Sequence, residues 1–223
     1  MQYLSNILIF SKTEADKAMP FDGKQTVIDG IHECLADNQG LIEVNSGKTK
    51  RGYDYIYSIV KTIRDNFEGA LYFLRMNVGN DSNIIEIQAT FEEQGVTGER
   101  ESYCVSFAQN AELVTISDDK LVGWSEDPYD PSYEKGIPMN LSEREGVDAF
   151  FPDHPLSQAR EFIAAAINDQ FLVDRSGAGL PEEDDTESGN AFKDEYEGTG
   201  NKFFIDLFAK DPVLQRYTLD IDV

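Results

Sequence analysis

The densest group of ionisable side chains near the expected core surrounds one turn of the chain. Glu92 and Glu93 end an apolar run, and Arg100 and Glu101 follow the turn Gly95–Gly98. Paired carboxylates can divide the roles of general acid and general base when their environments differ. Neighbouring residues of a strand point to opposite faces, so Glu92 and Glu93 should not share one site. We expect Arg100 to brace the turn through an ion pair with a glutamate, and any active site to lie here.

Three tyrosines alternate along another apolar run, beside the most basic stretch of the sequence. Tyr53, Tyr55 and Tyr57 fall on one face of a strand that follows the lysines and arginine of residues 48–51. An aromatic face with a basic rim can stack the bases of single-stranded nucleic acid. Aromatic side chains on strands more often pack into a core, however. We predict core packing for the three rings and keep Tyr53 and Tyr55 as candidate binding residues.

The segment Asp184–Glu195 has the register of a calcium-binding loop. Asp184 and Glu195 stand at its first and twelfth positions, where such a loop has carboxylate ligands. Thr186 and Ser188 stand at the third and fifth positions, where carboxylates are usual, and a glycine-rich stretch precedes the segment in place of a helix. We predict that this segment attracts divalent cations diffusely and forms no specific site. We also predict that the protein binds neither a cofactor nor a metal.

Two cysteines and two histidines complete the side chains that could act as nucleophiles or metal ligands. Cys34 lies two residues from His32, a spacing that points the two side chains about 160° apart on a helix. Cys34 belongs to an apolar helical stripe, so we predict a buried structural thiol. Two cysteines are too few for a disulfide framework, which favours a cytoplasmic location.

The elements that position these residues follow from the periodicity of apolar side chains. Three runs rich in aromatic and β-branched residues alternate with the period of strands, and a shorter run precedes them. Loops of only four or five residues join the three longer runs, so neighbouring strands should be antiparallel. Both faces of the tyrosine-bearing run are apolar, which predicts a strand covered on two sides. The expected strands are 41–44, 53–64, 71–78 and 84–91.

Three helices are predicted from apolar residues at three- and four-residue spacing. Thr26 should begin the first helix and Gly40 should end it, because glycine tolerates the left-handed conformation found after many helices. Tyr103 and Phe107 should face the core from the second helix. Together the elements predict an α+β fold, an antiparallel meander with helices packed on the sheet. The expected helices are 26–38, 98–109 and 155–172.

Acidic side chains are concentrated in the second half of the 223-residue chain, whose net charge is −23. Residues 1–116 carry ten basic and seventeen acidic side chains, whereas residues 117–223 carry nine and twenty-five. Acidic, glycine-rich stretches bury too little apolar surface to offset the entropy of ordering. We predict one domain over 1–173, which comprises a core (1–116), a partly disordered acidic loop (117–155) and a helix (155–172). A flexible acidic segment (174–201) should follow it, and then an apolar segment (202–223) that packs back on the domain.

The order of these elements resembles the PsbP-like α/β sandwich. In that fold an early helix precedes an antiparallel meander, and a later helix packs on the sheet. The resemblance rests on the pattern of Val27–Asn38, Tyr53–Arg64, Leu71–Val78, Ile84–Phe91 and Thr97–Ala108 and on no motif. It implies a binding or assembly subunit, because members of that fold mostly act in this way.

These observations favour a non-enzymatic, soluble, cytoplasmic interaction protein with one or more protein partners. The excess of carboxylates argues against nucleic acid as a partner. No run approaches the ~18 apolar residues of a membrane helix. One alternative is an acidic inhibitor or immunity-type protein that covers a basic partner, because an acidic field steers such partners together. Another is a small-molecule enzyme that uses the 92–101 turn, and this alternative requires a concave pocket beside the turn.

Overall fold

The computed structural model describes residues 6–12, 19–64, 69–79, 84–93, 95–118, 120–168 and 218–219. The candidate calcium loop Asp184–Glu195 and the acidic segment 174–201 lie outside the described residues. Of the apolar segment 202–223, only residues 218–219 are described, as a short strand.

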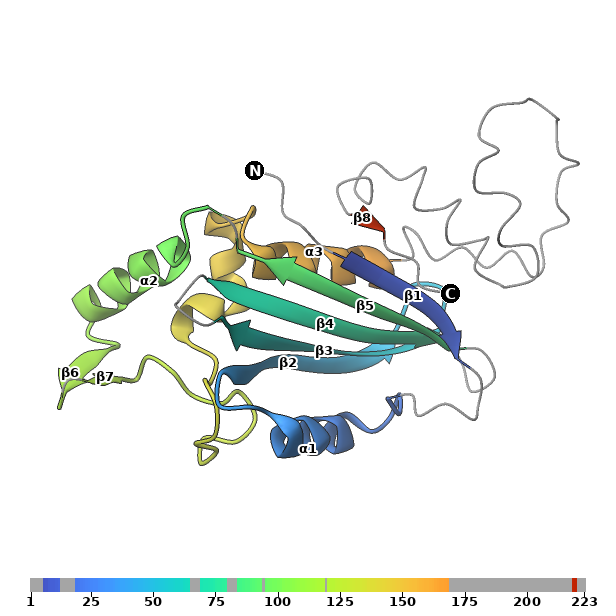
Figure 1. Ribbon diagram of the computed structural model, residues 1–223, viewed down its shortest axis with the longest axis horizontal. Helices are drawn as coiled ribbons and strands as arrows, with labels where there is room; N and C mark the ends of the chain where they lie inside the picture. Colours follow the sequence, from blue (N-terminus) through green and yellow to red (C-terminus); the bar gives the residue numbers. More distant parts are fainter. Residues whose placement is uncertain are drawn as a thin grey trace, which may run out of the picture.

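An antiparallel meander of four strands forms the centre of the molecule, which confirms the predicted α+β fold (Figure 1). A further strand, β1, pairs with β5 in antiparallel orientation, and the short β8 pairs with β1 in parallel. The predicted strands do not include β1, and the predicted strand 41–44 covers only part of β2. The strands are β1 (Asn6–Lys12), β2 (Gln39–Lys48), β3 (Asp54–Ile63), β4 (Ala70–Gly79), β5 (Ile84–Glu92) and β8 (Thr218–Leu219).

Helices cover both faces of the meander (Figure 1). The helix α1 (Lys24–Cys34) packs on one face around Ile28, and α3 (Pro155–Ile167) packs on the other through Phe162, which is fully buried. Because side chains alternate along a strand, β3 supplies both faces: Ile56 lies under α1, and Ile59 lies under α3. This two-sided burial is what the apolar character of both faces predicted.

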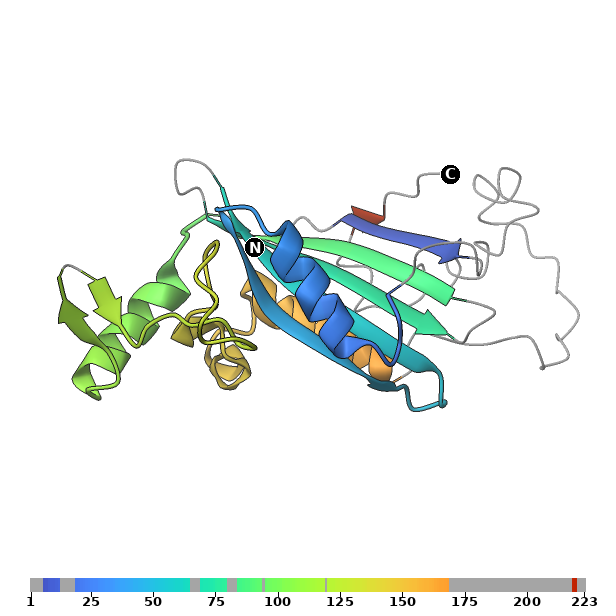
Figure 2. The ribbon, with the colours of Figure 1, turned by 90° about the horizontal axis from the view of Figure 1, so that it is seen from below.

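A second substructure lies at one end of the sheet and extends beyond it (Figures 1 and 2). It consists of the helix α2 and a two-stranded hairpin, and we call it the arm. The described part of the expected loop 117–155 also contains two 3₁₀ helices, η2 and η3, and η2 contacts α2. The bounds are α2 (Glu99–Asn110), β6 (Thr115–Ser117), β7 (Lys120–Val122), η2 (Leu141–Glu143) and η3 (Glu145–Phe150).

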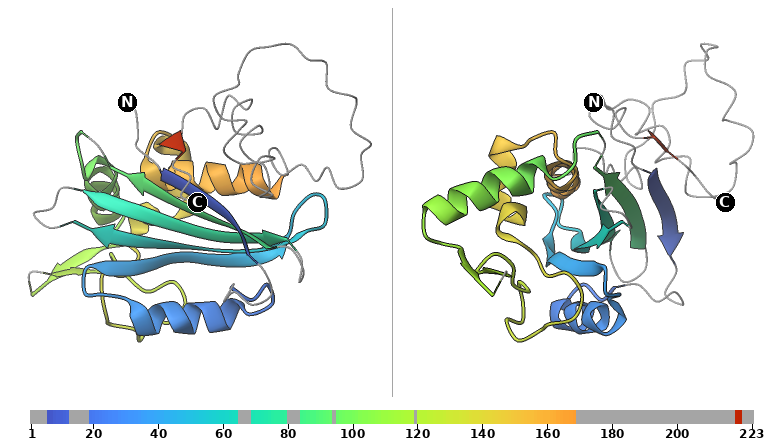
Figure 3. Two further views of the ribbon diagram at one scale, coloured as in Figure 1. Left: turned by 45° about the vertical axis from the view of Figure 1, so that its right-hand side comes forward. Right: turned by 60° about the vertical axis from the view of Figure 1, so that its left-hand side comes forward.

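The segment 124–140 returns from the arm and packs against α1 and β2 (Figure 3). The Tyr129 hydroxyl donates to the carbonyl oxygen of Val44 at 2.9 Å and accepts from its N–H at 2.6 Å. Gly40 permits this approach, because a Cβ there would stand 1.7 Å from the carbonyl oxygen of Ile137. The prediction that Gly40 ends the first helix is therefore wrong: it belongs to β2, and its missing side chain serves the passing segment.

Three other local predictions are corrected by the structure. The first helix begins at Lys24 after Gly23, so Thr26 lies inside it and does not cap it. Cys34 is exposed, because α1 ends there and Leu35 takes the buried position. Tyr103 and Phe107, expected in the core, are also exposed. None of the helices within the described ranges has the length and apolar character needed to cross a membrane.

Candidate functional site

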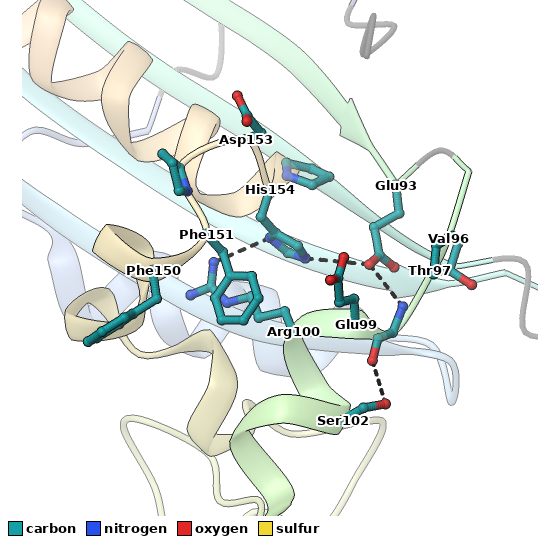
Figure 4. Close-up of a pocket in the computed structure, with 13 residues that line it drawn as sticks. Glu93, Val96, Thr97, Glu99, Arg100, Ser102, Phe150, Phe151, Asp153 and His154 are labelled. Atoms are coloured by element: carbon teal, nitrogen blue, oxygen red, sulfur yellow. Dashed lines mark hydrogen bonds and ion pairs between the residues drawn. The ribbon is translucent and has the colours of Figure 1, made fainter. Parts of the chain in front are cut away.

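A cavity of about 510 Å³ lies beside the 92–101 turn, where the N-terminal ends of α2 and α3 come together. Its walls combine acidic, imidazole and aromatic side chains, including Glu93, Glu99, Phe150, Asp153 and His154 (Figure 4). The residues come from the end of β5, the start of α2 and the segment that leads into α3. The pocket that the enzyme alternative requires is thus present at the predicted turn.

Glu93 is the buried carboxylate of this cavity, and its oxygens are held by two backbone donors and by the nearby His154 ring. Oε2 accepts from the N–H of Ala70 at 2.9 Å, and Oε1 accepts from the N–H of Gly98 at 3.2 Å. His154 Nε2 lies 3.5 Å from Oε1 (Figure 4). Burial by itself would raise the pKa of Glu93, but these donors stabilise the anion and hold its pKa below the ordinary value of 4.5. Glu93 is therefore a charged anchor that joins β5, β4, α2 and α3.

The orientation of the His154 ring is fixed by groups on both of its nitrogens. Nδ1 accepts from the N–H of Leu156 at 3.2 Å and lies 3.3 Å from Nη1 of Arg100. A guanidinium only donates, so Nδ1 presents its lone pair and the ring proton is on Nε2, directed at Glu93. The ring thus presents no lone pair to the cavity, and a general base would need one. In this geometry His154 caps α3 and stabilises Glu93.

Arg100 is 1% exposed, lines the cavity and is the centre of a buried hydrogen-bond network. Its five N–H groups have five acceptors. Three are the Ser142 carbonyl oxygen at 2.7 Å, the Ser157 hydroxyl at 2.9 Å and the Asp148 carboxylate at 2.7 Å; the others are His154 Nδ1 and the Arg144 carbonyl oxygen. The predicted ion pair of Arg100 with a glutamate of the turn is wrong, since its carboxylate partner is Asp148 of η3.

The two adjacent glutamates have different partners, as strand alternation predicted. Glu92 forms an ion pair with Arg64, the residue that follows β3, whereas Glu93 faces His154. An arginine–glutamate ion pair therefore does stand at this turn, but it joins Arg64 to Glu92 and does not involve Arg100.

Glu101 lies behind the cavity and does not line it. Burial, followed by the negative charges of Glu93 and Glu143, raises its pKa, although a backbone hydrogen bond and His154 act in the opposite direction. Its Oε2 atom is buried and has no hydrogen-bond partner among the described residues. Among the four ionisable residues predicted for this turn, only Glu93 and Arg100 line the pocket.

A second buried ion pair fastens η2, in the acidic loop 117–155, to the sheet. Lys61 of β3 donates to Glu143 of η2 at 2.7 Å, and the hydroxyl of Tyr72 donates to the same carboxylate at 3.2 Å. Both charged side chains are at most 2% exposed. Glu143 is therefore a buried carboxylate, and so is Asp127, which pairs with His32 at 3.0 Å.

The tyrosines of β3 belong to the core, which confirms the predicted packing. Tyr55 and Tyr57 are buried in the cluster under α3, and Tyr53 is partly buried against it. Burial raises the pKa of Tyr55, and burial together with the neighbouring Glu43 raises that of Tyr57. Because rings packed under α3 cannot stack on bases, Tyr55 and Tyr57 form no stacking platform.

The arm and the residues beside it carry an exposed apolar surface, of which only Tyr103 and Phe107 were predicted to face the core. Among the described residues, all eight large hydrophobic side chains that are exposed lie within residues 96–150. Phe107 is 65% exposed and Ile116 is 68% exposed. We call this set the arm surface; it joins the cavity, whose walls include two of its members, Val96 and Phe150. The set is Val96, Tyr103, Phe107, Leu113, Ile116, Leu121, Val122 and Phe150.

The sequence contained weak signals for parts of this site that the predictions missed. His154 precedes Pro155, a residue typical of a helix start, and this marks it as a helix-capping residue rather than a pocket residue. Phe150 carried no signal, because its role depends on residues some fifty positions earlier. Within the described residues, no group of three or more potential metal ligands comes together.

No protein-family model matches the chain, and a comparison with curated proteins finds no relative.

Proposed function

We propose that this protein is a non-enzymatic, soluble, cytoplasmic binding protein that docks a protein partner through the arm surface. The observation that carries this proposal is the segregation of exposed apolar side chains. All eight that the described residues contain lie at one end of the molecule, whereas the outer faces of α1 and α3 contain none. Exposed apolar side chains gathered at one end of a molecule typically mark a site of protein association.

The chemistry of the cavity supports binding over catalysis. The Nδ1 lone pair of His154 is occupied, and every N–H of Arg100 already has an acceptor. Two backbone N–H groups and the nearby His154 hold Glu93 as a structural anchor. None of these three buried groups keeps the free reactive atom of a nucleophile or base, and the other carboxylates of the cavity, Glu99 and Asp153, are exposed. The resemblance to PsbP-like proteins, predicted from element order alone, stays a prediction that agrees with a binding role.

The proposal is tested by making the arm surface polar without altering charge. We expect the double substitution Phe107→Gln and Ile116→Thr to lower partner recovery at least about tenfold, since a few central apolar residues carry most of the affinity of an interface. The measurement is quantitative cross-linking of the tagged full chain in cell extract, followed by mass spectrometry. Recovery is compared protein by protein between the original chain and the variant.

The matched control is Gln109→Ala with Thr115→Ser, two exposed polar positions on the same helix and the same hairpin. Both variants should keep the melting temperature of the original chain. If the apolar variant recovers the same proteins in the same amounts as the control, the arm surface is not a docking site.

A further inference from the structure

The exposed charges around the arm surface are mostly negative. Within the described residues 95–150, seven exposed side chains are acidic and three are basic. The acidic ones are Glu99, Glu112, Asp118, Glu126, Asp130, Glu134 and Glu145, and the basic ones are Lys120, Lys135 and Arg144. The one other cation of this stretch, Arg100, is buried and fully engaged. We propose that the arm surface and the adjoining cavity together bind a cationic amphipathic helix of a partner protein, with a lysine or arginine side chain seated in the cavity. This inference rests on the proposed function and specifies the chemistry of its partner.

The cavity has the composition that receives a cationic side chain. Glu99 and Asp153 line it and are exposed, and the buried Glu93 adds a fixed negative charge behind them. Phe150 and Phe151 provide aromatic walls. The methylene stem of a lysine or arginine can pack on such rings while its charged end reaches the carboxylates. An anionic ligand would meet the same carboxylates and is therefore disfavoured.

The arm surface has the spacing that receives a helix. Tyr103 and Phe107 stand one turn apart on α2, so their side chains are neighbours on the helix surface. Ile116 and Leu121 stand opposite each other on the hairpin that follows α2, and both are exposed. An amphipathic helix that lays its apolar face along such a surface is a recurring mode of recognition. Its polar face, if basic, would lie among the carboxylates that surround the surface.

Charge also decides against two occupants from this chain itself, a second copy and the acidic segment 174–201. A second copy would bring the same patch and the same carboxylates together, because a two-fold interface pairs a surface with itself. The segment 174–201 of the same chain contains nine acidic and only two basic residues. Like charges brought face to face weaken an interface. A basic partner complements this end of the molecule, whereas neither of these does.

The experiment uses the full chain and a synthetic peptide of defined chemistry. The peptide has about 18 residues, roughly five helical turns, with leucines on one helical face and lysines on the other. A scrambled peptide of identical composition serves as the control, because it has the same charge but no apolar face. We expect the amphipathic peptide to bind at least about tenfold more tightly, measured by isothermal titration calorimetry. Equal affinity for the two peptides would overturn the inference, since attraction by charge alone would then explain the binding.

Variants of the chain separate the cavity from the arm surface. We expect Glu99→Gln with Asp153→Asn to weaken binding of the amphipathic peptide about fivefold, the upper range for exposed charge pairs. Glu112→Gln with Glu126→Gln removes the same net charge outside the cavity and should change the affinity less than about twofold. If the two double variants lose affinity equally, the cavity seats no cationic side chain, and the proposed function is untouched. If Phe107→Gln with Ile116→Thr binds the peptide as the original chain does, the arm surface is not used, and both proposals fail.

Discussion

The meander sandwich and the arm are held in place by different forces. Between α1 and α3, the sheet buries apolar side chains on both faces, with Phe162 and Ile56 fully enclosed. At the arm, α2 buries only Arg100 and Ala108 and leaves Phe107 in solvent. Apolar burial therefore stabilises the sandwich, whereas buried charge pairs attach the arm. The comparison shows that a helix can be fixed in place by polar contacts and still present an apolar face outward.

Phe162→Ala should have the largest effect on the sandwich. Phe162 is fully buried and packs edge-to-face against Phe91, with ring centroids 6.3 Å apart. Removal of a buried phenyl ring typically lowers the free energy of unfolding by about 3–5 kcal/mol. Urea denaturation of the full chain measures the loss, and amide exchange should show it in β3 and β4. A loss under about 1 kcal/mol would mean that α3 is not part of the core.

Arg100→Gln should loosen the arm and spare the sheet. The substitution leaves Ser142, Ser157 and Asp148 without the guanidinium, although Asp148 keeps Arg160 at 3.1 Å. Breaking a buried ion pair costs about 3–5 kcal/mol, and we expect about 3 kcal/mol because Asp148 retains this second partner. Hydrogen exchange should report the loss in α2, while amides of β3 and β4 keep their protection.

The control for this substitution is Arg144→Gln. Arg144 is exposed, and it accepts from Arg100 only through its backbone carbonyl oxygen, which the substitution keeps. It should change stability by less than about 0.5 kcal/mol. Equal loss of protection in α2 and in the sheet of the Arg100 variant would show that arm and sandwich unfold as one unit.

Glu93→Gln tests the joint between the two regions through its pH dependence. The pKa of Glu93 is lower in the folded chain than the ordinary value of 4.5, so the anion stabilises the fold above that value. This contribution is lost as the pH falls below 4.5 and through the lower folded-state pKa. We expect the variant to be less stable near neutral pH by about 1–2 kcal/mol, and to lose less further stability on acidification.

The pH series is read against Glu99→Gln, an exposed carboxylate on the same turn. This control leaves Glu93 in place and should therefore show the acid sensitivity of the original chain. A Glu93 variant whose stability falls as steeply with acid as that of the control would mean that another group produces the effect.

The sandwich was predictable because its signals are local. Alternation of Tyr55 and Tyr57 with Ile56 gave the two-sided burial of β3, and the short loops gave its antiparallel neighbours. The turn at 92–101 was likewise recognised as the place where ionisable groups meet an end of the sheet. The partners of Arg100 could not be predicted in this way, because they lie 42 to 57 positions further along the chain. No periodicity reports such pairings.

The arm was mispredicted for a related reason. Tyr103 and Phe107 look like the core face of α2 when apolar residues are assumed to lie inside. The structure buries the side of α2 that carries Arg100 and Ala108, because that side meets η2 and the acceptors around it. Which face of a weakly amphipathic helix is buried depends on what the rest of the chain places beside it.

The amino-acid sequence by itself determined the class of fold and the strands at its centre, because strand periodicity and loop length act between residues close together in the chain. Only the tertiary structure decided which carboxylates are buried, which cation each one meets and which apolar side chains stay in water. These outcomes depend on burial and on distances between remote residues. Charge interactions are strong or weak according to that burial, and composition alone does not carry the information.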